Sequence, residues 1–301
     1  MPHKGEQAEV PVRTADGRTL EVLAIGPPGG LPMVFHHGTP GGIAVYGPMA
    51  DAAAERGLRT VLYARPGYGG STPLPGRSVA DAARDVAAIL DQLGAPQFVT
   101  AGWSGGGPHS LACAYLLPDR CLAAATLAGV APYRADGLEW LAGMADDNIG
   151  EFTAALAGEA KLTALLTEVA PLTTGLTGES IADGIGDLAS ASDKQALRAG
   201  LGDYVAEMFR SGLRPGIAGW RDDDLAFVRD WGFAVGGPGP GAAAPVSVWQ
   251  GDDDKMVPYA HGQWLARRLP AARSHFSAGT GHMNLPFAGI FDELLDLADG
   301  R

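Results

Sequence analysis

The chain has 301 residues, of which 46% are hydrophobic and 19% are charged, and this composition excludes an intrinsically disordered protein. Its formal net charge of −12 opposes binding to nucleic acid or to an anionic membrane, because both of these carry negative charge. A chain of this length suits one large domain or a core with an insertion.

Signals for targeting and for metals are missing from the sequence. No run approaches the roughly 18 apolar residues of a membrane span, and residues 1–9 lack the apolar segment of a signal peptide. The two cysteines, Cys113 and Cys121, are too few for a disulfide framework or a cysteine zinc site. We therefore expect a cytoplasmic protein without a metal or a cofactor; its oligomeric state is not predicted.

Strand and helix patterns alternate in the first part of the chain. Strands are predicted at 8–14, 18–25, 33–36, 60–63, 97–103 and 122–127, and helices at 44–56, 78–93 and 107–116. The first two strands are joined by a turn at Asp16-Gly17, and Ser78 is a candidate N-cap with Asp81 at its N3 position. Strands that alternate with helices predict a parallel sheet in a doubly wound α/β fold.

The pattern changes between residues 132 and 240. Helices are predicted at 138–157, 159–169, 193–210 and 222–230, with no strand between them, and a Gly- and Pro-rich linker follows at 236–241. Alternation then resumes with strands at 245–249 and 272–276 and helices at 259–269 and 285–297. The sequence thus predicts a core domain (1–131 and 241–301) interrupted by a helical insertion (132–240).

Residues 102–106 read G-W-S-G-G, which matches the G-x-S-x-G turn of a nucleophilic serine. The turn lies between a predicted strand and a predicted helix, where a sharp bend needs small neighbours and leaves the serine oxygen exposed. The N-terminus of the following helix also favours developing negative charge. We therefore predict Ser104 as a nucleophile.

A serine nucleophile needs a base and an acid that orients the base. His282 follows a predicted strand, where open α/β sheets place their sites, and is the candidate base. The acid is one of Asp252, Asp253 and Asp254, which also follow a strand and lack the spacing of a calcium loop. Four other histidines are expected to be structural or solvated: His3, His109, His261 and His275.

The order of these residues resembles that of the α/β-hydrolase family, as do three further motifs. They are H-H-G-T-P-G-G at 36–42, R-P-G-Y-G at 65–69 and G-D-D-D-K-M-V-P at 251–258. The resemblance implies an eight-stranded, mostly parallel sheet with a helical cap, and it selects Asp254 as the acid. It also implies an oxyanion hole made by the backbone N–H groups of Thr39 and Gly105.

The serine favours acyl transfer to water, with an ester, thioester or lactone as a small-molecule substrate. It excludes the family members that use a carboxylate nucleophile. The alternatives are an aminopeptidase similar to proline iminopeptidases, a cofactor-free perhydrolase or haloperoxidase, and a ligand-binding receptor with slow turnover. A dinucleotide-binding oxidoreductase lacks its G-x-G-x-x-G motif here.

The insertion is expected to form the roof of an apolar pocket over Ser104. Candidates for its lining are His37, Trp103, Trp140, Met144, Phe152 and Trp220, with His37 expected mainly to shape its loop. An aminopeptidase would need an acid there to hold a substrate ammonium. We interpret the acids of the insertion as a solvated helix face instead: Glu139, Asp146, Asp147 and Glu151.

Overall fold

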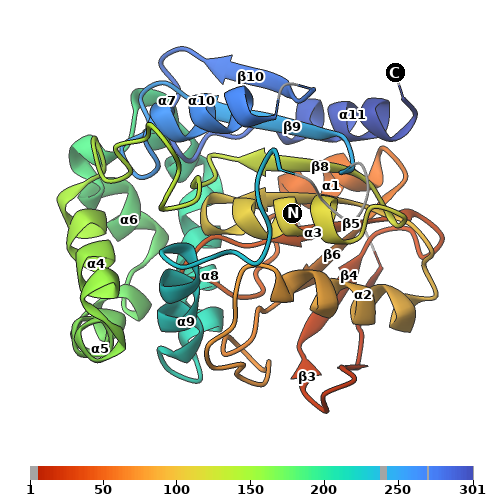
Figure 1. Cartoon of the computed structure of the whole chain (residues 1–301), viewed down its shortest axis with the longest axis horizontal. Coiled ribbons are helices and arrows are strands. Elements are labelled where there is room, and N and C mark those ends of the chain that lie inside the picture. The colour runs from red at the N-terminus through yellow and green to blue at the C-terminus, as the bar shows by residue number, and fades with distance from the viewer. Residues whose placement is uncertain (1–5, 238–242, 270, 301) are drawn as a thin grey trace.

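A single large sheet forms the centre of the protein in a computed structural model that describes residues 6–237, 243–269 and 271–300 (Figure 1). Its strands are β1 (Gln7–Glu9), β4 (Val22–Ile25), β5 (Leu31–His36), β6 (Leu58–Tyr63), β7 (Phe98–Trp103), β8 (Cys121–Leu127), β9 (Val246–Gly251) and β10 (Arg273–Ser277). They are arranged in the order β1-β4-β6-β5-β7-β8-β9-β10. All neighbours from β6 to β10 are parallel, and the pairs β1–β4 and β4–β6 are antiparallel. The predicted eight-stranded, mostly parallel sheet is confirmed.

The N-terminal hairpin differs from its prediction. Each of the two predicted strands is divided, so that β2 (Val12–Arg13) pairs with β3 (Thr19–Leu20) in a small separate sheet, while β1 pairs with β4. The predicted turn lies at the tip, where Gly17 has φ 87°. Val12 and Leu20 are buried partners, so the tip packs on the core instead of extending the large sheet.

Helices cover both faces of the sheet. Helices α2 (Asp81–Leu93), α3 (Gly107–Leu116) and α10 (Tyr259–Arg268) pack on one face, and α1 (Gly47–Ala54) and α11 (Phe287–Ala298) on the other. Strand β7 is buried along its whole length, with Phe98 in one apolar cluster and Val99 in the other. A parallel strand with two covered faces needs this continuous apolar run, which explains why its sequence does not alternate.

The start of α2 is a correction. Helix α2 begins at Asp81, three residues after Ser78, so Ser78 is not its N-cap. Both the backbone N–H and the hydroxyl of Ser78 donate to the Asp81 carboxylate, at 2.7 and 3.0 Å. The hydroxyl therefore acts as a donor to a charged side chain and is not the acceptor that a capping serine provides.

Between β8 and β9 the chain forms α4 (Asp146–Ala157), α5 (Glu159–Thr174), α6 (Gly178–Gly184), α7 (Ala191–Ala196), α8 (Gly202–Leu213) and α9 (Ala218–Phe227). These six, called the cap helices below, gather on one side of the sheet (green to teal in Figure 1). They lie within the predicted 132–240 insertion. The end of that insertion and most of the predicted linker fall in 238–242, outside the described residues.

Individual helices of the cap differ from the predictions. Residues 138–145 form turns, with Gly143 at φ 86°, so the first helix starts at Asp146. The predicted helix 193–210 is two helices separated at Gly200, which has φ 109°. Helix α6 was not predicted, because its seven residues include two glycines and carry no apolar period. Among the described residues, no helix is both long and apolar enough to cross a membrane.

Candidate active site

Ser104 stands at the bend between β7 and α3, as the first residue of a short 3-10 turn. Its φ of 56° lies in the left-handed region, which a residue with a side chain rarely adopts. A Cβ atom on Gly102 would collide with the Gly106 carbonyl, and one on Gly106 with the His36 carbonyl. The two glycines on either side of Ser104 are therefore required by the closeness of the backbone at this turn.

His282 and Asp254 are joined by a hydrogen bond of 2.8 Å between Nδ1 and Oδ2. Both side chains are buried, and they come from the turns that follow the neighbouring strands β10 and β9. The carboxylate is fixed further by the backbone N–H groups of Met256 and Val257, each 2.9 Å from Oδ1, and by the Gln250 amide at 2.9 Å from Oδ2. Asp254 therefore has a single orientation, toward His282.

The other two acids of this run lie in water. Asp252 and Asp253 are exposed, and the Asp252 carboxylate accepts the Gly279 N–H at 2.7 Å. That bond ties the turn after β9 to the turn after β10. Of the three acids, only Asp254 contacts His282, and Asp254 is the one that the family motif selected.

The charged form of His282 is favoured by its neighbours. Burial by itself lowers the pKa of this imidazole, but the negative charge of Asp254, its hydrogen bond and the nearby Asp193 outweigh burial, and the net pKa is raised above 6.5. Because Nδ1 faces Asp254, the other ring nitrogen, Nε2, is left to act on a substrate or nucleophile.

Asp193, on cap helix α7, is a site residue that the sequence did not indicate. Its carboxylate accepts the backbone N–H groups of His282, Met283 and Asn284 at 3.0, 2.8 and 2.9 Å, and it has no exposed surface. A Cβ atom on Gly281 would collide with this carboxylate, which explains the glycine before His282. The capping box with Ser190 marks the start of α7, but that signal says nothing of a contact 89 residues away.

The predicted oxyanion-hole residues also face each other. Thr39 follows β5, and a side chain on Gly105 would collide with the Thr39 hydroxyl. Both residues line the same cavity as Ser104. The backbone segments that carry the two proposed N–H donors are therefore adjacent to the serine.

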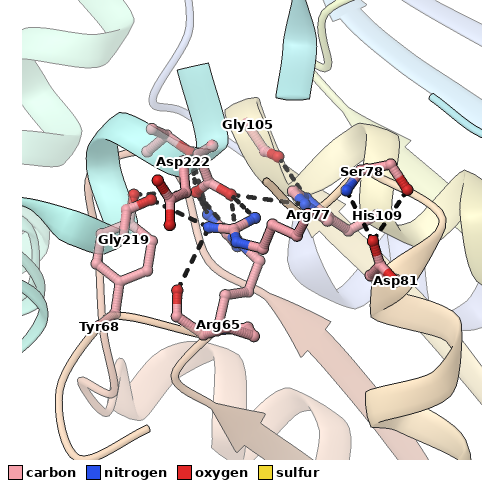
Figure 2. Close-up of polar contacts among 12 residues, drawn as sticks. Arg65, Tyr68, Arg77, Ser78, Asp81, Gly105, His109, Gly219 and Asp222 are labelled. Atoms are coloured by element: carbon pink, nitrogen blue, oxygen red, sulfur yellow. Dashed lines mark hydrogen bonds and ion pairs between the residues drawn. The ribbon is translucent and has the colours of Figure 1, made fainter. Parts of the chain in front are cut away.

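A buried ion cluster supports the Thr39 segment (Figure 2). The Asp223 carboxylate on α9 accepts the Thr39 hydroxyl at 2.9 Å and pairs with Arg65 and Arg77 at 2.6 and 2.5 Å. Arg65 also donates to the carbonyls of His37 and Gly38 at 2.6 and 3.0 Å. The cluster therefore links a cap helix directly to the loop that would form half of the oxyanion hole.

The charge state of this cluster follows from its partners. Burial works to raise the pKa of Asp223, but the two guanidinium groups hold it well below its usual value. Arg65 was noted in the sequence only as part of a motif, and neither Arg77 nor Asp223 was singled out. Asp223 and Thr39 are 184 residues apart, so no local pattern could connect them.

A cavity of about 410 Å³ opens over Ser104. Two of the six predicted lining residues, Phe152 and Trp220, lie on it, together with cap residues such as Ile181, Val205 and Phe209. The insertion therefore does roof the serine.

The other four candidates are buried elsewhere and do not line this cavity: His37, Trp103, Trp140 and Met144. Trp140 packs on Phe152 and on His261, with its indole N–H bonded to the Ala131 carbonyl at 2.6 Å. Trp103 donates to the His282 carbonyl at 3.0 Å. Met144 lies in the core cluster that contains Trp140. Packing and hydrogen bonds therefore position these side chains away from the cavity.

Three other histidines, His37, His109 and His261, hold backbone in place. His37 Nδ1–H donates to the Gly38 carbonyl at 2.7 Å and Nε2 accepts the Arg65 N–H at 3.3 Å, so it shapes its loop as predicted. His109 contacts the Gly105 carbonyl at 2.9 Å, and burial lowers its pKa well below 6.5. His261 bonds to Ala131 and Trp140, and His275 stacks on Trp249, while His3 lies outside the described residues.

The four acids that we interpreted as a solvated helix face do not all lie in water. Glu139, Asp146 and Asp147 are exposed, although Asp147 borders the cavity. Glu151 is different: it lines the cavity, accepts the Trp220 indole N–H at 2.9 Å, and has its pKa raised by burial. Our interpretation of Glu151 as a solvated residue is therefore wrong, because α4 turns this position inward. Within the described part of the chain, no three His, Cys, Asp or Glu side chains converge as metal ligands would.

Comparisons with known proteins agree with this architecture. A family model described as alpha/beta hydrolase fold matches residues 32–288. A non-heme chloroperoxidase from Streptomyces lividans is 32% identical over 148 residues, which are 48% of this chain and 54% of that protein. This chain thus spans about half the length of the curated relatives that it matches.

Solved structures resemble the whole chain. An alpha/beta hydrolase fold protein from Nakamurella multipartita has a TM-score of 0.65 and 23% identity, covering 98% of this chain and all of its own. A thermophilic esterase from Thermogutta terrifontis has a TM-score of 0.62 and 18% identity, covering 98% of this chain and 97% of its own. Identities this low indicate the fold alone.

Proposed function

The chain belongs to the alpha/beta hydrolase fold family, and we propose that it is a serine hydrolase that cleaves a small ester, thioester or lactone through an acyl-enzyme. The observation that carries the proposal is the 2.8 Å bond between His282 and Asp254, together with a serine held at φ 56° on the wall of a cavity. The indole of Trp103, the residue before Ser104, donates to the His282 carbonyl at 3.0 Å. A strained serine after β7 and an oriented, buried imidazole after β10, both at the carboxyl ends of parallel strands, suit nucleophilic catalysis.

In this proposal the Ser104 oxygen attacks the substrate carbonyl carbon while Nε2 of His282 takes the hydroxyl proton. The C–O or C–S bond to the leaving group then breaks, and His282 returns the proton to it. Water attacks the acyl-enzyme by the same route and releases the acid. Asp254 keeps the imidazole in the tautomer with Nδ1–H and stabilises its charged form, which agrees with the raised pKa of His282.

The backbone N–H groups of Thr39 and Gly105 would stabilise the oxyanion. Removing one such donor typically costs about 2.7–4 kcal/mol of transition-state stabilisation. The Asp223 cluster supports this role, because its bonds to the Thr39 hydroxyl and, through Arg65, to the His37 and Gly38 carbonyls fix the loop before the reaction begins. A preformed hole needs no reorganisation when charge develops.

The proposal is tested by labelling with a fluorophosphonate and by hydrolysis of p-nitrophenyl butyrate. We expect the protein to be labelled at Ser104, and Ser104→Ala to lose both labelling and turnover, with kcat lower by about 10⁴-fold or more. Ser211→Ala is the matched control, since its hydroxyl donates to the Met208 carbonyl within α8. A folded Ser104→Ala variant that hydrolyses the ester at the wild-type rate would refute the proposal.

A perhydrolase is a second candidate, because the Streptomyces lividans relative is a chloroperoxidase. Such an enzyme forms a peracid and water from a carboxylic acid and hydrogen peroxide. The acids in this cavity, Glu151 and Asp224, disfavour an anionic carboxylate substrate. We therefore expect ester hydrolysis to exceed peroxide-dependent bromination in acetate buffer, measured on the same preparation.

A further inference from the structure

The roof of the cavity holds two carboxyl groups next to each other. Glu151 from α4 and Asp224 from α9 both line it, and the Asp224 side chain has no exposed surface. Burial raises the pKa of both carboxyl groups, and the charge of Glu151 raises that of Asp224 further. Two carboxylates next to each other repel, so such a pair is stabilised by a proton or by a bound cation.

The pair has more acceptor capacity than the protein satisfies. Neither oxygen of Asp224 accepts a hydrogen bond from any donor in the described part of the chain, and Glu151 accepts one, from Trp220. The nearby guanidinium groups of Arg65 and Arg77 are engaged by Asp223. Buried acceptors without donors are rare, and here both residues belong to the wall of a cavity large enough for a ligand.

The surroundings of the pair favour a positive group. Aromatic side chains line the same cavity, namely Phe152, Trp220 and Phe227, and the faces of such rings attract cations. A charged N–H donor to a carboxylate also makes a stronger hydrogen bond than a neutral donor does. An anionic group would be repelled by the charge of the pair.

The pair lies close to the proposed reaction centre. Asp223, the residue before Asp224, contacts Thr39, and the Phe227 ring would be 3.1 Å from a Cβ on Gly105. Helix α9 therefore lies directly over the segments that carry the proposed oxyanion hole. A ligand group held by Asp224 would share a cavity with the Ser104 hydroxyl.

We propose that Glu151 and Asp224 form a binding site for a protonated primary or secondary amine, and that the preferred substrates are esters that carry such an amine. The second half of this inference rests on the proposed function, whereas the first half concerns binding alone. The amine would donate its N–H groups to the free oxygens of the pair while its carbon chain contacts the aromatic wall.

Binding is tested by calorimetry with 2-phenylethylamine, 2-phenylethanol and trimethyl(2-phenylethyl)ammonium. We expect the primary amine to bind at least about tenfold more tightly than the alcohol, which is neutral, and than the quaternary ion, which has no N–H. Glu151→Gln and Asp224→Asn should each weaken amine binding by about 30-fold or more, the loss of one partner from a buried charge pair.

The control is Asp146→Asn, which removes the same charge from an exposed position on α4 and should bind the amine as the wild type does. The two test variants lie on different helices, so a folding defect in one leaves the other informative. Equal affinity for the amine and the alcohol, or unchanged amine affinity in both variants, would overturn the site.

Substrate preference is tested with the p-nitrophenyl esters of 6-aminohexanoate and heptanoate, which differ by an ammonium in place of a methyl group. We expect kcat/KM for the amino ester to be at least about tenfold higher, and the ratio to approach one in Glu151→Gln and Asp224→Asn. Labelling of Ser104 with a ratio near one would overturn the substrate preference and leave the proposed function standing. Amine binding without labelling would overturn the proposed function and leave the site standing.

Discussion

The chain contains two runs of three consecutive aspartates, Asp222–Asp224 on helix α9 and Asp252–Asp254 after strand β9. In the second run two side chains are exposed and only Asp254 is buried, where it meets His282. In the first run all three are buried, although they are neighbours along one helix. The difference arises because a turn can direct successive side chains into water, whereas a covered helix directs them into three separate environments about 100° apart.

The run on helix α9 shows how the pKa of a buried aspartate depends on whether its neighbour is an arginine or another acid. Burial raises the pKa of Asp222, which pairs with Arg221 at 2.8 Å, and raises that of Asp224 much further, where the neighbour is another acid. Asp223 is just as buried, yet two arginines hold its pKa well below the usual value. The cost of desolvation is common to all three, so the identity of the partner decides in which direction each pKa moves.

The largest effect is expected within the run after β9. Asp254→Asn should lower kcat by about 10³–10⁴-fold, because an amide favours the wrong tautomer of the imidazole. Asp252→Asn and Asp253→Asn should remain within about tenfold of the wild type, since both side chains are exposed. Steady-state hydrolysis of p-nitrophenyl butyrate measures all three, and a reversed ranking would move the proposed acid to another residue.

A large loss of stability is expected within the helical run. Asp223→Asn removes the shared partner of Arg65 and Arg77 and leaves two buried positive charges, which should cost about 3–5 kcal/mol of the free energy of unfolding. Urea denaturation measures this loss. A variant as stable as the wild type would show that the arginines find other acceptors and that the cluster does not hold the cap to the Thr39 loop.

Asp193 extends the comparison to a carboxylate satisfied by backbone N–H groups. Asp193→Asn removes the charge and one acceptor, so one of three N–H groups of the His282 turn loses its partner. We expect a loss of about 1–3 kcal/mol in stability and a decrease of about tenfold in kcat with little change in KM. A proportional rise in KM with unchanged kcat would indicate that the turn affects binding and not the position of the base.

The smallest effect is expected at Asp224, and it depends on pH. Its folded pKa is raised above the unfolded value of 3.8, so the folded protein holds more protons and wild-type stability falls as the pH rises above about 4. Asp224→Asn should flatten this slope and leave stability at neutral pH equal or higher by up to about 1 kcal/mol. Unfolding measured at several pH values checks this, and a steeper slope in the variant would contradict the assignment.

Features that depend on neighbouring residues were predictable from the sequence. Uniformly apolar strands between helical patterns predict a parallel sheet, since both faces must be covered. Gly102 before Ser104 predicts a sharp turn, because it relieves a contact with Gly106 within that same segment. The family motif selected Asp254, the buried aspartate of the run after β9. It could do so because the motif specifies how far along the chain this residue lies from the end of the strand.

Tertiary structure decided the contacts between distant segments. Asp193 and His282 are 89 residues apart, and Asp223 and Thr39 are 184 apart. In both pairs, the sequence around one residue contains no indication of the other. The same reason explains why Trp140 packs against the core while Trp220 lines the cavity, although both are apolar residues of the same insertion. Local patterns specify backbone and burial, but the partner of a buried side chain is set by how the helices pack. In this protein the partners determine whether the pKa of a buried aspartate is raised or lowered.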